Sequence, residues 1–464
     1  MKAESEVLPR VTPELDPGFR PMVLASRQFQ EAARATGRSV TLDLAVERSP
    51  ESVTRCQISL FPGDHPSSAG NFRLAERTLK FLLWARGGWR IWVAGSSFIG
   101  EQLRAYYRDT PTGGFDAALM GEKIYARPFE VRAVELGDLP AESERTQRLG
   151  GHWQGCRVGF DLGASDIKVA AVRDGTVLYS DEFRWDPRPQ QDPQWHFEQI
   201  QAALRAAASH LPRVDTIGGS SAGVIVGNEV RVASLFRGVP DALFETRVRL
   251  LFREIQKSWG DVPFEVVNDG EVTALAGSMS LESPAVLGIA MGSSLAAGFV
   301  SREGNITPWL NELAFAPVDV RNDAPFDEWS GDRGCGVQFF SQQAVARLIP
   351  ASGLPISSEW ALPDRLLAVQ TAMKEGDERA ARIYRTLGVC LGYAAAQYRE
   401  FYDFDHLLLL GRVTTGVGGD LLLEQARRVL ALEFPEIGAR LHMPDEKQKR
   451  HGQAMAAASL PASL

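Results

Sequence analysis

The sequence of 464 residues has only four cysteines, Cys56, Cys156, Cys335 and Cys390, and no two of them form a CxxC pair. Such wide spacing argues against a disulfide framework and against a zinc site built from four thiolates. Free thiols are typical of the reducing cytoplasm, so we expect a cytoplasmic protein.

The sequence also lacks long apolar runs and an excess of positive charge. Its most apolar long window, AVLGIAMGSSLAAGFV, is too short and too rich in glycine for a helix that spans a membrane. The first residues, MKAESEVLPRV, lack the apolar core of a signal peptide. The formal net charge is −8 with no basic stripe, so we expect no nucleic-acid partner and no membrane partner.

What the sequence does contain is the balance of a globular protein, with 44% hydrophobic and 23% charged residues. Its length suggests about three domains. Composition and periodicity divide it into a loose N-terminal arm (1–20), an α+β domain of unknown role (21–138), a polar linker (139–155) and two further units (156–285 and 286–464).

Apolar periodicity predicts strands and helices in each of these segments. Turn signals at Asp174-Gly175 and Gly227-Asn228 predict two tight hairpins. The expected strands are 39–47, 55–61, 89–95, 157–163, 167–173, 264–268 and 406–411, and the expected helices are 72–85, 98–108, 193–210, 241–258, 269–279, 336–348, 378–402 and 419–433.

The last two units contain similar stretches. GASDIKVAAVRDG begins at Gly163 and GSSLAAGFVSREG begins at Gly292, and they share glycine, serine and arginine positions at one constant offset. Such self-similarity indicates a duplicated unit, although any two glycine-rich hairpins look somewhat alike. Two facing hairpins of this kind would direct backbone N–H groups at a common anion.

Two other stretches place polar or small residues at the end of a buried strand. FEVVNDGEVTAL delivers Asn268 and Asp269 to the start of a helix. LLLLGRVTTGVGGDLLLEQARRVL ends a strand at Gly411 and leads through three further glycines into a helix. Glycine leaves room for a base and a ribose against such a turn, although a tight structural loop gives the same pattern.

Two small-residue hairpins, a carboxylate between them and a late glycine-rich turn together resemble the actin-like ATPase superfamily. Within it, the sequence is similar to the ROK family of repressors, open reading frames and sugar kinases. The resemblance covers about residues 156–440 and leaves out the first domain, where ROK repressors carry a winged helix-turn-helix that this sequence does not show. It implies a duplicated α/β fold of two actin-like (ribonuclease H-like) lobes, with ATP and Mg²⁺ as cofactors, and it points to a homodimer.

The resemblance places the phosphates of ATP against the two hairpins and the adenosine against the late turn. Small residues let the backbone approach these groups closely, and Asp161 would hold Mg²⁺ through water. The nucleotide-binding residues implied in this way are Asp161, Gly163, Ala164, Ser165, Gly292, Ser293, Ser294, Gly411, Gly416 and Gly418.

The resemblance also makes Asp269 the catalytic base. A sugar hydroxyl is a poor nucleophile at neutral pH until a carboxylate accepts its proton. The implied substrate-binding residues are Asn268, Asp269, Glu312 and Gly223. The alternative for Asp269 is a simple helix cap, a role that aspartate often fills.

The acceptor end departs from the family pattern. Phe315 stands where a zinc-ligating histidine is expected, and the zinc loop keeps only Cys335, so we expect no zinc. Two further polar sugar ligands are replaced, one by Val337 and one near Leu235. Because selection of hydroxyl groups needs buried polar partners, the phosphate end looks intact and the acceptor end altered.

The leading hypothesis is a cytoplasmic ATP-dependent kinase that phosphorylates a hydroxyl of a sugar or sugar-like small molecule. One alternative is a catalytically silent sensor that binds nucleotide or a small ligand and signals through its extra domain. Another is a phosphotransferase with a non-sugar acceptor, which the apolar replacements favour. A DNA-binding repressor needs a helix-turn-helix and a basic face, and the sequence shows neither. In the first domain, Trp84, Trp89 and Trp92 either line a carbohydrate-binding face or pack in the core.

Overall fold

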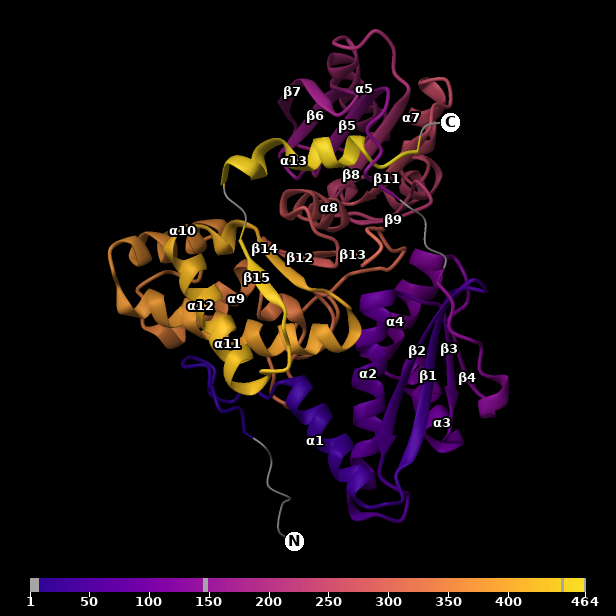
Figure 1. Ribbon diagram of the computed structural model, residues 1–464, viewed down its shortest axis with the longest axis vertical. Helices are drawn as coiled ribbons and strands as arrows, with labels where there is room; N and C mark the ends of the chain where they lie inside the picture. Colours follow the sequence, from indigo (N-terminus) through magenta and orange to yellow (C-terminus); the bar gives the residue numbers. More distant parts are fainter. Residues whose placement is uncertain (1–7, 145–148, 444–445, 463–464) are drawn as a thin grey trace.

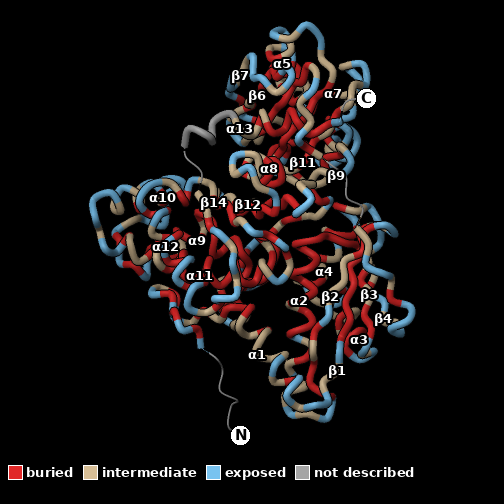
Figure 2. Tube along the Cα trace, in the orientation of Figure 1, coloured by how far each residue is buried: buried red, intermediate tan, exposed pale blue. Residues whose placement is uncertain are grey.

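The computed structural model describes residues 8–144, 149–443 and 446–462. Figure 1 shows three bodies: the N-terminal domain in indigo and violet, a first lobe in magenta and red, and a second lobe in orange and yellow. Buried residues run through the strands of all three bodies (Figure 2). Within the described ranges, no helix is long and apolar enough to cross a bilayer.

The N-terminal domain is built on a four-stranded sheet. Its strands lie in the order β2 (Ser52–Leu60), β1 (Val40–Ser49), β3 (Arg90–Ala94) and β4 (Glu130–Ala133). The central strand β1 pairs antiparallel with both neighbours, and β4 pairs parallel with β3. The three strands expected here are confirmed, whereas β4 has only four residues and is too short to show a clear alternation.

Helices cover this sheet and face the second lobe (Figure 1). The two expected helices are confirmed as α2 (Asn71–Arg86) and α3 (Ser97–Asp109). A third helix, α4 (Pro111–Ala118), starts with a proline and is capped by Thr110, whose Oγ1 accepts from the N–H of Gly113.

The segment 8–20 does not form the loose arm expected from its composition. It lies along α11 (Glu378–Phe401) of the second lobe, where the N–H of Val11 donates to the Tyr393 hydroxyl at 3.2 Å. Helix α1 (Met22–Ala35) then packs between α11 and β2. Isolated apolar residues make these contacts, and composition does not single them out.

The first lobe contains a five-stranded sheet. Its strands lie in the order β11 (Phe264–Asn268), β8 (Thr216–Ser221), β5 (Cys156–Leu162), β6 (Asp166–Arg173) and β7 (Thr176–Arg184). Strands β5, β6 and β7 form antiparallel hairpins, while β8 and β11 run parallel to β5. The strands and the first tight turn expected here are confirmed.

Helices of the first lobe match the expectation less closely. Helix α5 (Pro193–Ala208) is confirmed. The single helix expected over 241–258 is broken, because the N–H of Arg249 bonds to the carbonyl of Phe244 at 2.9 Å in a π-helical turn, and α7 (Leu251–Ser258) begins only afterwards. The other elements of this lobe are α6 (Asp241–Leu243), β9 (Val224–Val226), β10 (Glu229–Val232) and α8 (Asp269–Leu281).

The second lobe contains a four-stranded sheet in the order β13 (Leu295–Val300), β12 (Val286–Met291), β14 (His406–Leu410) and β15 (Arg440–His442). The helix expected from residue 336 begins later than expected, since residues 336–338 form a 3₁₀ turn first. The helices of this lobe are α9 (Gln342–Ser352), α10 (Leu362–Lys374), α11 and α12 (Val417–Glu433).

The two lobes share one topology. In each, the first strand forms a hairpin with the second and runs parallel to a later strand: β5 with β6 and β8, and β12 with β13 and β14. Gly163 directly follows β5, and Gly292 directly follows β12. The sequence repeat is therefore a structural duplication, and the expected two-lobe fold is confirmed.

The C-terminal helix α13 (Glu446–Ala458) does not belong to the second lobe, where the sequence placed it. It crosses back and packs on β5, β6 and β8 (Figure 1). A Cβ on Gly159 would lie 1.9 Å from the carbonyl oxygen of Ala454, and one on Gly218 would lie 1.8 Å from that of Ala457. These two glycines allow the helix backbone to rest directly on the sheet.

Candidate active site

A cavity of about 420 Å³ lies where the two lobes and the N-terminal domain meet, and we call it the central cavity. Its walls come from the ends of β5, β11 and β12, from the start of α8 and from α2 of the N-terminal domain. The site residues predicted from the sequence that line it are Gly163, Ala164, Gly223, Asn268, Asp269, Gly292, Ser293, Ser294 and Glu312.

The turns after β5 and β12 are built alike. The N–H of Gly163 bonds to the carbonyl of Asp166, and the N–H of Gly292 bonds to that of Ser294, both at 2.9 Å. Among the described residues, the N–H groups of Ala164, Ser165, Ser293 and Ser294 donate to no backbone carbonyl. A Cβ on Gly292 would approach only one atom, at 3.6 Å, so an anion has room to reach these N–H groups.

Asp161 lies near the end of β5, two residues before the first turn. Its carboxylate is buried and lies 3.5 Å from the ammonium of Lys168, which also lies 3.2 Å from Asp166. Burial raises the pKa of Asp161, and Lys168 opposes this shift. Ser165 is exposed, and its hydroxyl donates to Asp166 at 3.0 Å. A carboxylate at this place fits a magnesium ion held through water.

Asn268, and not Asp269, is the cap of α8. The Asn268 Oδ1 accepts from the N–H of Gly270 at 2.7 Å, and its Nδ2 donates to the carbonyl of Gly223 at 2.7 Å. Asp269 is therefore not needed as the cap, although its Oδ1 also accepts from the N–H of Gly270 at 3.0 Å. Asp269 lines the central cavity, and its role as a base stays a prediction.

The two carboxyl groups of the cavity titrate differently. Burial raises the pKa of Asp269 to about 6, and the Asp161 carboxylate adds to the shift. Burial, followed by repulsion from Asp269, raises the pKa of Glu312 to about 8. At neutral pH Asp269 is therefore mostly ionised and can accept a proton, whereas Glu312 is mostly protonated and can donate a hydrogen bond.

The segment that carries Glu312 is attached to the N-terminal domain. The N–H groups of residues 310–312 donate to the carbonyls of residues 84–86 at distances of 2.9 to 3.2 Å. These carbonyls end α2, where helix carbonyls have no partner within the helix. The N-terminal domain therefore fixes one carboxyl group of the site.

Apolar side chains replace the polar ligands that the family pattern calls for, as the sequence indicated. Phe315 and Leu235 line the central cavity, while Val337 is buried. The sequence did not reveal that Trp84 and Trp329 line the same cavity. Of the three tryptophans singled out in the N-terminal domain, Trp84 and Trp89 are buried and Trp92 is half-buried.

Arg188 is a further site residue that sequence reasoning missed. It stands in the loop between β7 and α5 and lines the central cavity near Gly163 and Ala164. Its Nε is buried and has no hydrogen-bond partner among the described residues. A single arginine in a proline-rich loop gives no motif, so only the fold could place it here.

The loop that corresponds to the family's zinc loop is held by a buried lysine. Lys80 Nζ of α2 lies 2.8 Å from Asp116 and 3.1 Å from Asp332, and Cys335 Sγ lies 3.9 Å from Asp332. Burial alone lowers the pKa of Lys80, but these two carboxylates raise it above its ordinary value. In the described part of the chain, no group of three or more metal-ligating side chains is found. The lack of a zinc ion remains a prediction.

The three glycines predicted to bind adenosine lie in different environments. Gly411 lines a neighbouring cavity of about 260 Å³, which shares Ala290 with the central cavity. Gly416 has a φ of 74° at the start of α12, and a Cβ there would meet nothing within 4 Å. Gly418 is buried, and a Cβ there would lie 2.4 Å from the Tyr384 ring, so this glycine allows α12 to pack on α11; its contact with adenosine stays a prediction.

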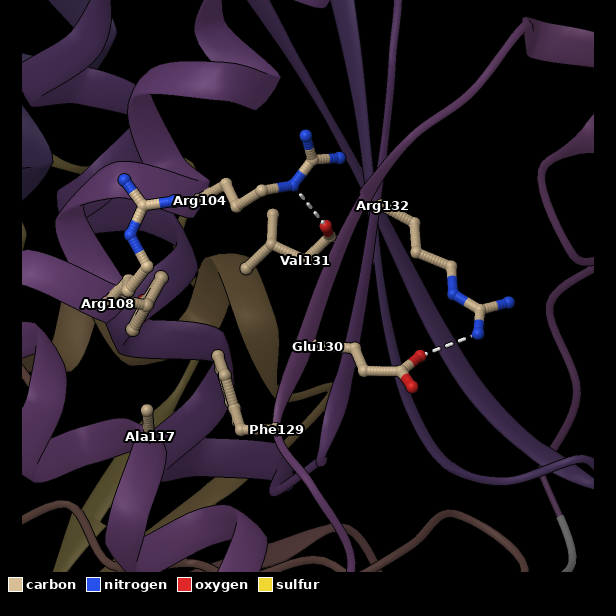
Figure 3. Close-up of a pocket in the computed structure, with 8 residues that line it drawn as sticks. Arg104, Arg108, Ala117, Phe129, Glu130, Val131 and Arg132 are labelled. Carbon is tan, nitrogen blue, oxygen red and sulfur yellow. Dashed lines mark hydrogen bonds and ion pairs between the residues drawn. The ribbon is translucent and has the colours of Figure 1, made fainter.

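A separate cavity lies on the N-terminal domain, between α3 and β4 (Figure 3). Three arginines surround it, but each already bonds to a nearby oxygen. Arg104 donates to the carbonyl of Val131 and to Glu101, Arg108 donates to Asp109, and Arg132 pairs with Glu130. None of the site residues predicted from the sequence lines this cavity.

The fold is similar to that of solved ROK proteins. A ROK hexokinase from Thermus thermophilus superposes with a TM-score of 0.51 at 18% identity, over 65% of this chain and 97% of that one. A ROK glucokinase from Streptomyces griseus, solved with glucose and AMPPNP, gives 0.50 at 19% identity over 66% and 99%. A ROK transcriptional regulator homologous to the E. coli MLC protein gives 0.51 at 19% identity over 66% and 76%.

No protein-family model and no curated protein sequence matches the chain. The superpositions establish the fold. Because the identities are below one fifth, they do not establish the activity, which has to be argued from the site. About one third of this chain lies outside each match. The chain therefore has the two-lobed, actin-like fold of the ROK sugar kinases and regulators.

Proposed function

We propose that this protein is an ATP-dependent kinase that phosphorylates a hydroxyl of a sugar-like small molecule. The observation that carries the proposal is the shared cavity: Asp269 and Glu312 line the same space as two turns with N–H groups that donate to no backbone carbonyl among the described residues. Phosphoryl transfer needs a phosphate cradle and a base within one enclosed site.

In the proposed reaction, Mg-ATP supplies the γ-phosphoryl group. The N–H groups of the two turns would bind its phosphate oxygens, and Asp161 would hold a magnesium ion that neutralises phosphate charge. Asp269 accepts the proton of the acceptor hydroxyl as the new P–O bond forms and the bond to ADP breaks. Glu312, protonated at neutral pH, donates a hydrogen bond to a second acceptor oxygen. Arg188 neutralises charge on the transferring group.

Release of ADP from Mg-ATP, with and without a panel of sugars and polyols, tests the proposal. We expect acceptor-dependent release that Asp269→Asn reduces by about 10²- to 10⁴-fold while ATP binding remains. ADP release by Asp269→Asn at the rate of the unaltered protein would contradict the role of this residue. Absence of ATP binding would contradict the kinase altogether.

The second candidate is a silent sensor that binds a nucleotide or a small ligand. The apolar residues Phe315 and Leu235 favour it, because they weaken recognition of a fully hydroxylated sugar. The attachment of Glu312 to α2 gives such a sensor a route from the cavity to the N-terminal domain. Tight ATP binding with no turnover on any acceptor would favour this candidate.

A further inference from the structure

The acceptor end of the central cavity has an aromatic wall, which we define as Trp84, Phe315 and Trp329. The Phe315 ring lies 4.7 Å from that of Trp84 and 4.5 Å from that of Trp329, between ring centroids. Trp329 is 49% exposed, although it lines a cavity and packs against three other rings, those of Trp84, Phe115 and Phe315. The wall lines the same cavity as Asp269 and Glu312.

The N-terminal domain holds this wall in place. The indole N–H of Trp84 donates to Asp116 at 3.2 Å. Phe115 of α4 contacts Trp329 edge to face, with ring centroids 4.9 Å apart. The Thr112 hydroxyl donates to the carbonyl of Gly331, two residues after Trp329, at 3.2 Å. Because these contacts hold Trp329 in place, little conformational entropy is lost when a ligand covers its exposed surface.

Polar partners are few at this end of the cavity. Both polar atoms of the Asn268 amide are already engaged, one with Gly223 and one with Gly270. The side chains that can contact hydroxyl groups here are the carboxyl groups of Asp269 and Glu312, the Ser234 hydroxyl and the second N–H of the Asn268 amide. A sugar ring can place its C–H face against such a wall, but the hydroxyl groups at its edge still need polar partners when they are buried. An apolar group gains from the same contact.

We propose that the acceptor is a hydroxylated compound that carries an apolar, ring-sized substituent, and that the aromatic wall binds this substituent. The reacting hydroxyl lies at Asp269, and the substituent covers the exposed surface of Trp329. The transfer step rests on the proposed kinase function, whereas the binding preference stands on the geometry of the cavity alone.

Matched pairs of glycosides test this inference with the full-length protein. For each of several monosaccharides and for both anomers, the methyl glycoside is compared with the phenyl glycoside. Calorimetry gives the Kd of each glycoside in the presence of a non-hydrolysable ATP analogue. ADP release from Mg-ATP gives kcat/KM for each glycoside. Since the two members of a pair share the same sugar, the ratio of their Kd values measures the contribution of the phenyl group. We expect the phenyl member to bind at least about tenfold more tightly, equivalent to about 1.4 kcal/mol.

Two tryptophan variants locate the preference. Trp329→Ala removes the exposed face of the wall and should bring the ratio of phenyl to methyl affinity close to one. Trp360→Ala removes a tryptophan that is 50% exposed but lines a different cavity, beside α10, and should leave the ratio unchanged. Circular dichroism and the affinity for the ATP analogue confirm that both variants are folded.

The outcomes separate this inference from the proposed function. Equal affinities within every pair would overturn the inference, while ADP release with methyl glycosides would leave the kinase intact. Tight phenyl binding that depends on Trp329 but drives no ADP release would support the inference and count against the kinase. Absence of binding by both members of every pair would overturn the inference as well.

Discussion

The buried ion cluster around Lys80 should make the fold sensitive to the loss of a single charged partner. Lys80 and Asp116 are fully buried, and Lys80 joins α2 to Asp332 of the loop that carries Trp329. Replacement of Lys80 by methionine keeps most of the length of the side chain but removes the charge. It leaves Asp116 buried with the Trp84 indole N–H, at 3.2 Å, as its one remaining side-chain donor among the described residues.

Removing one partner from a buried ion pair costs about 3–5 kcal/mol, because the remaining charge is left uncompensated. For lobes of this size that corresponds to a fall in Tm of roughly 10 °C. Burial already raises the pKa of Asp116 despite the nearby lysine. Without Lys80, the pKa of Asp116 in the folded state rises further. The folded variant then binds a proton that the unfolded chain releases, so the variant loses stability as pH rises. We therefore expect a larger loss of Tm at pH 8.5 than at pH 5.5.

The assay is differential scanning calorimetry of Lys80→Met at both pH values. The control is Arg38→Met. Both side chains of the ion pair between Arg38 and Asp64 are exposed, so the pair should contribute less than about 1 kcal/mol to the free energy of unfolding. Adding Asp116→Asn to Lys80→Met should restore part of the loss, since it removes the unpaired charge. If Lys80→Met changes Tm no more than the control at pH 8.5, the cluster does not stabilise this loop.

Four other predictions concern single side chains. With Asp269 as base, kcat/KM should rise with pH through about 6, the pKa that burial gives this group, in a pH–rate profile. Glu312→Gln should remove a fall in kcat/KM above about pH 8, because glutamine keeps the neutral form that glutamate loses there. Arg188→Gln should lower kcat/KM by about 10- to 100-fold, the effect of one charge-assisted hydrogen bond, with partial recovery in Arg188→Lys. Burial raises the pKa of Glu271 to about 8. The folded state therefore binds a proton that the unfolded state releases near pH 4.5, and the protein loses stability as pH rises from about 4.5 through 8. Glu271→Gln, which stays neutral, should raise Tm at pH 8.5 but hardly change it at pH 5.

The two glycine-rich turns of the candidate site could be predicted from the sequence because the pattern that marks them is local. A turn that lets the backbone approach a phosphate needs small residues in a short stretch, so Gly163 and Gly292 stand out by their neighbours along the chain. The same holds for Asn268 and Asp269, which follow a buried strand and start a helix. Gly418 shows the limit of this reasoning, because a packing glycine and a ligand-binding glycine look alike in a sequence.

The acceptor side could not be predicted in the same way because distant segments build it. Trp84 comes from the N-terminal domain, Arg188 from a loop of the first lobe and Trp329 from the second lobe. None of them belongs to a local motif, and their approach depends on how three bodies pack together. The sequence did show that polar ligands were missing, but it could not show that aromatic rings of another domain line the same space.

The N-terminal domain and the altered acceptor end are best understood together. The resemblance to the family implies a zinc loop, of which this sequence keeps only Cys335. Here the ammonium of Lys80 supplies a positive charge beside Asp332 and Cys335, and that lysine belongs to α2 of the extra domain. The last carbonyls of the same helix bind the backbone that carries Glu312. One helix thus positions the loop of Trp329, the segment of Glu312 and the ring of Trp84. A chain without this domain would lose the acceptor end of the site while keeping the two phosphate turns.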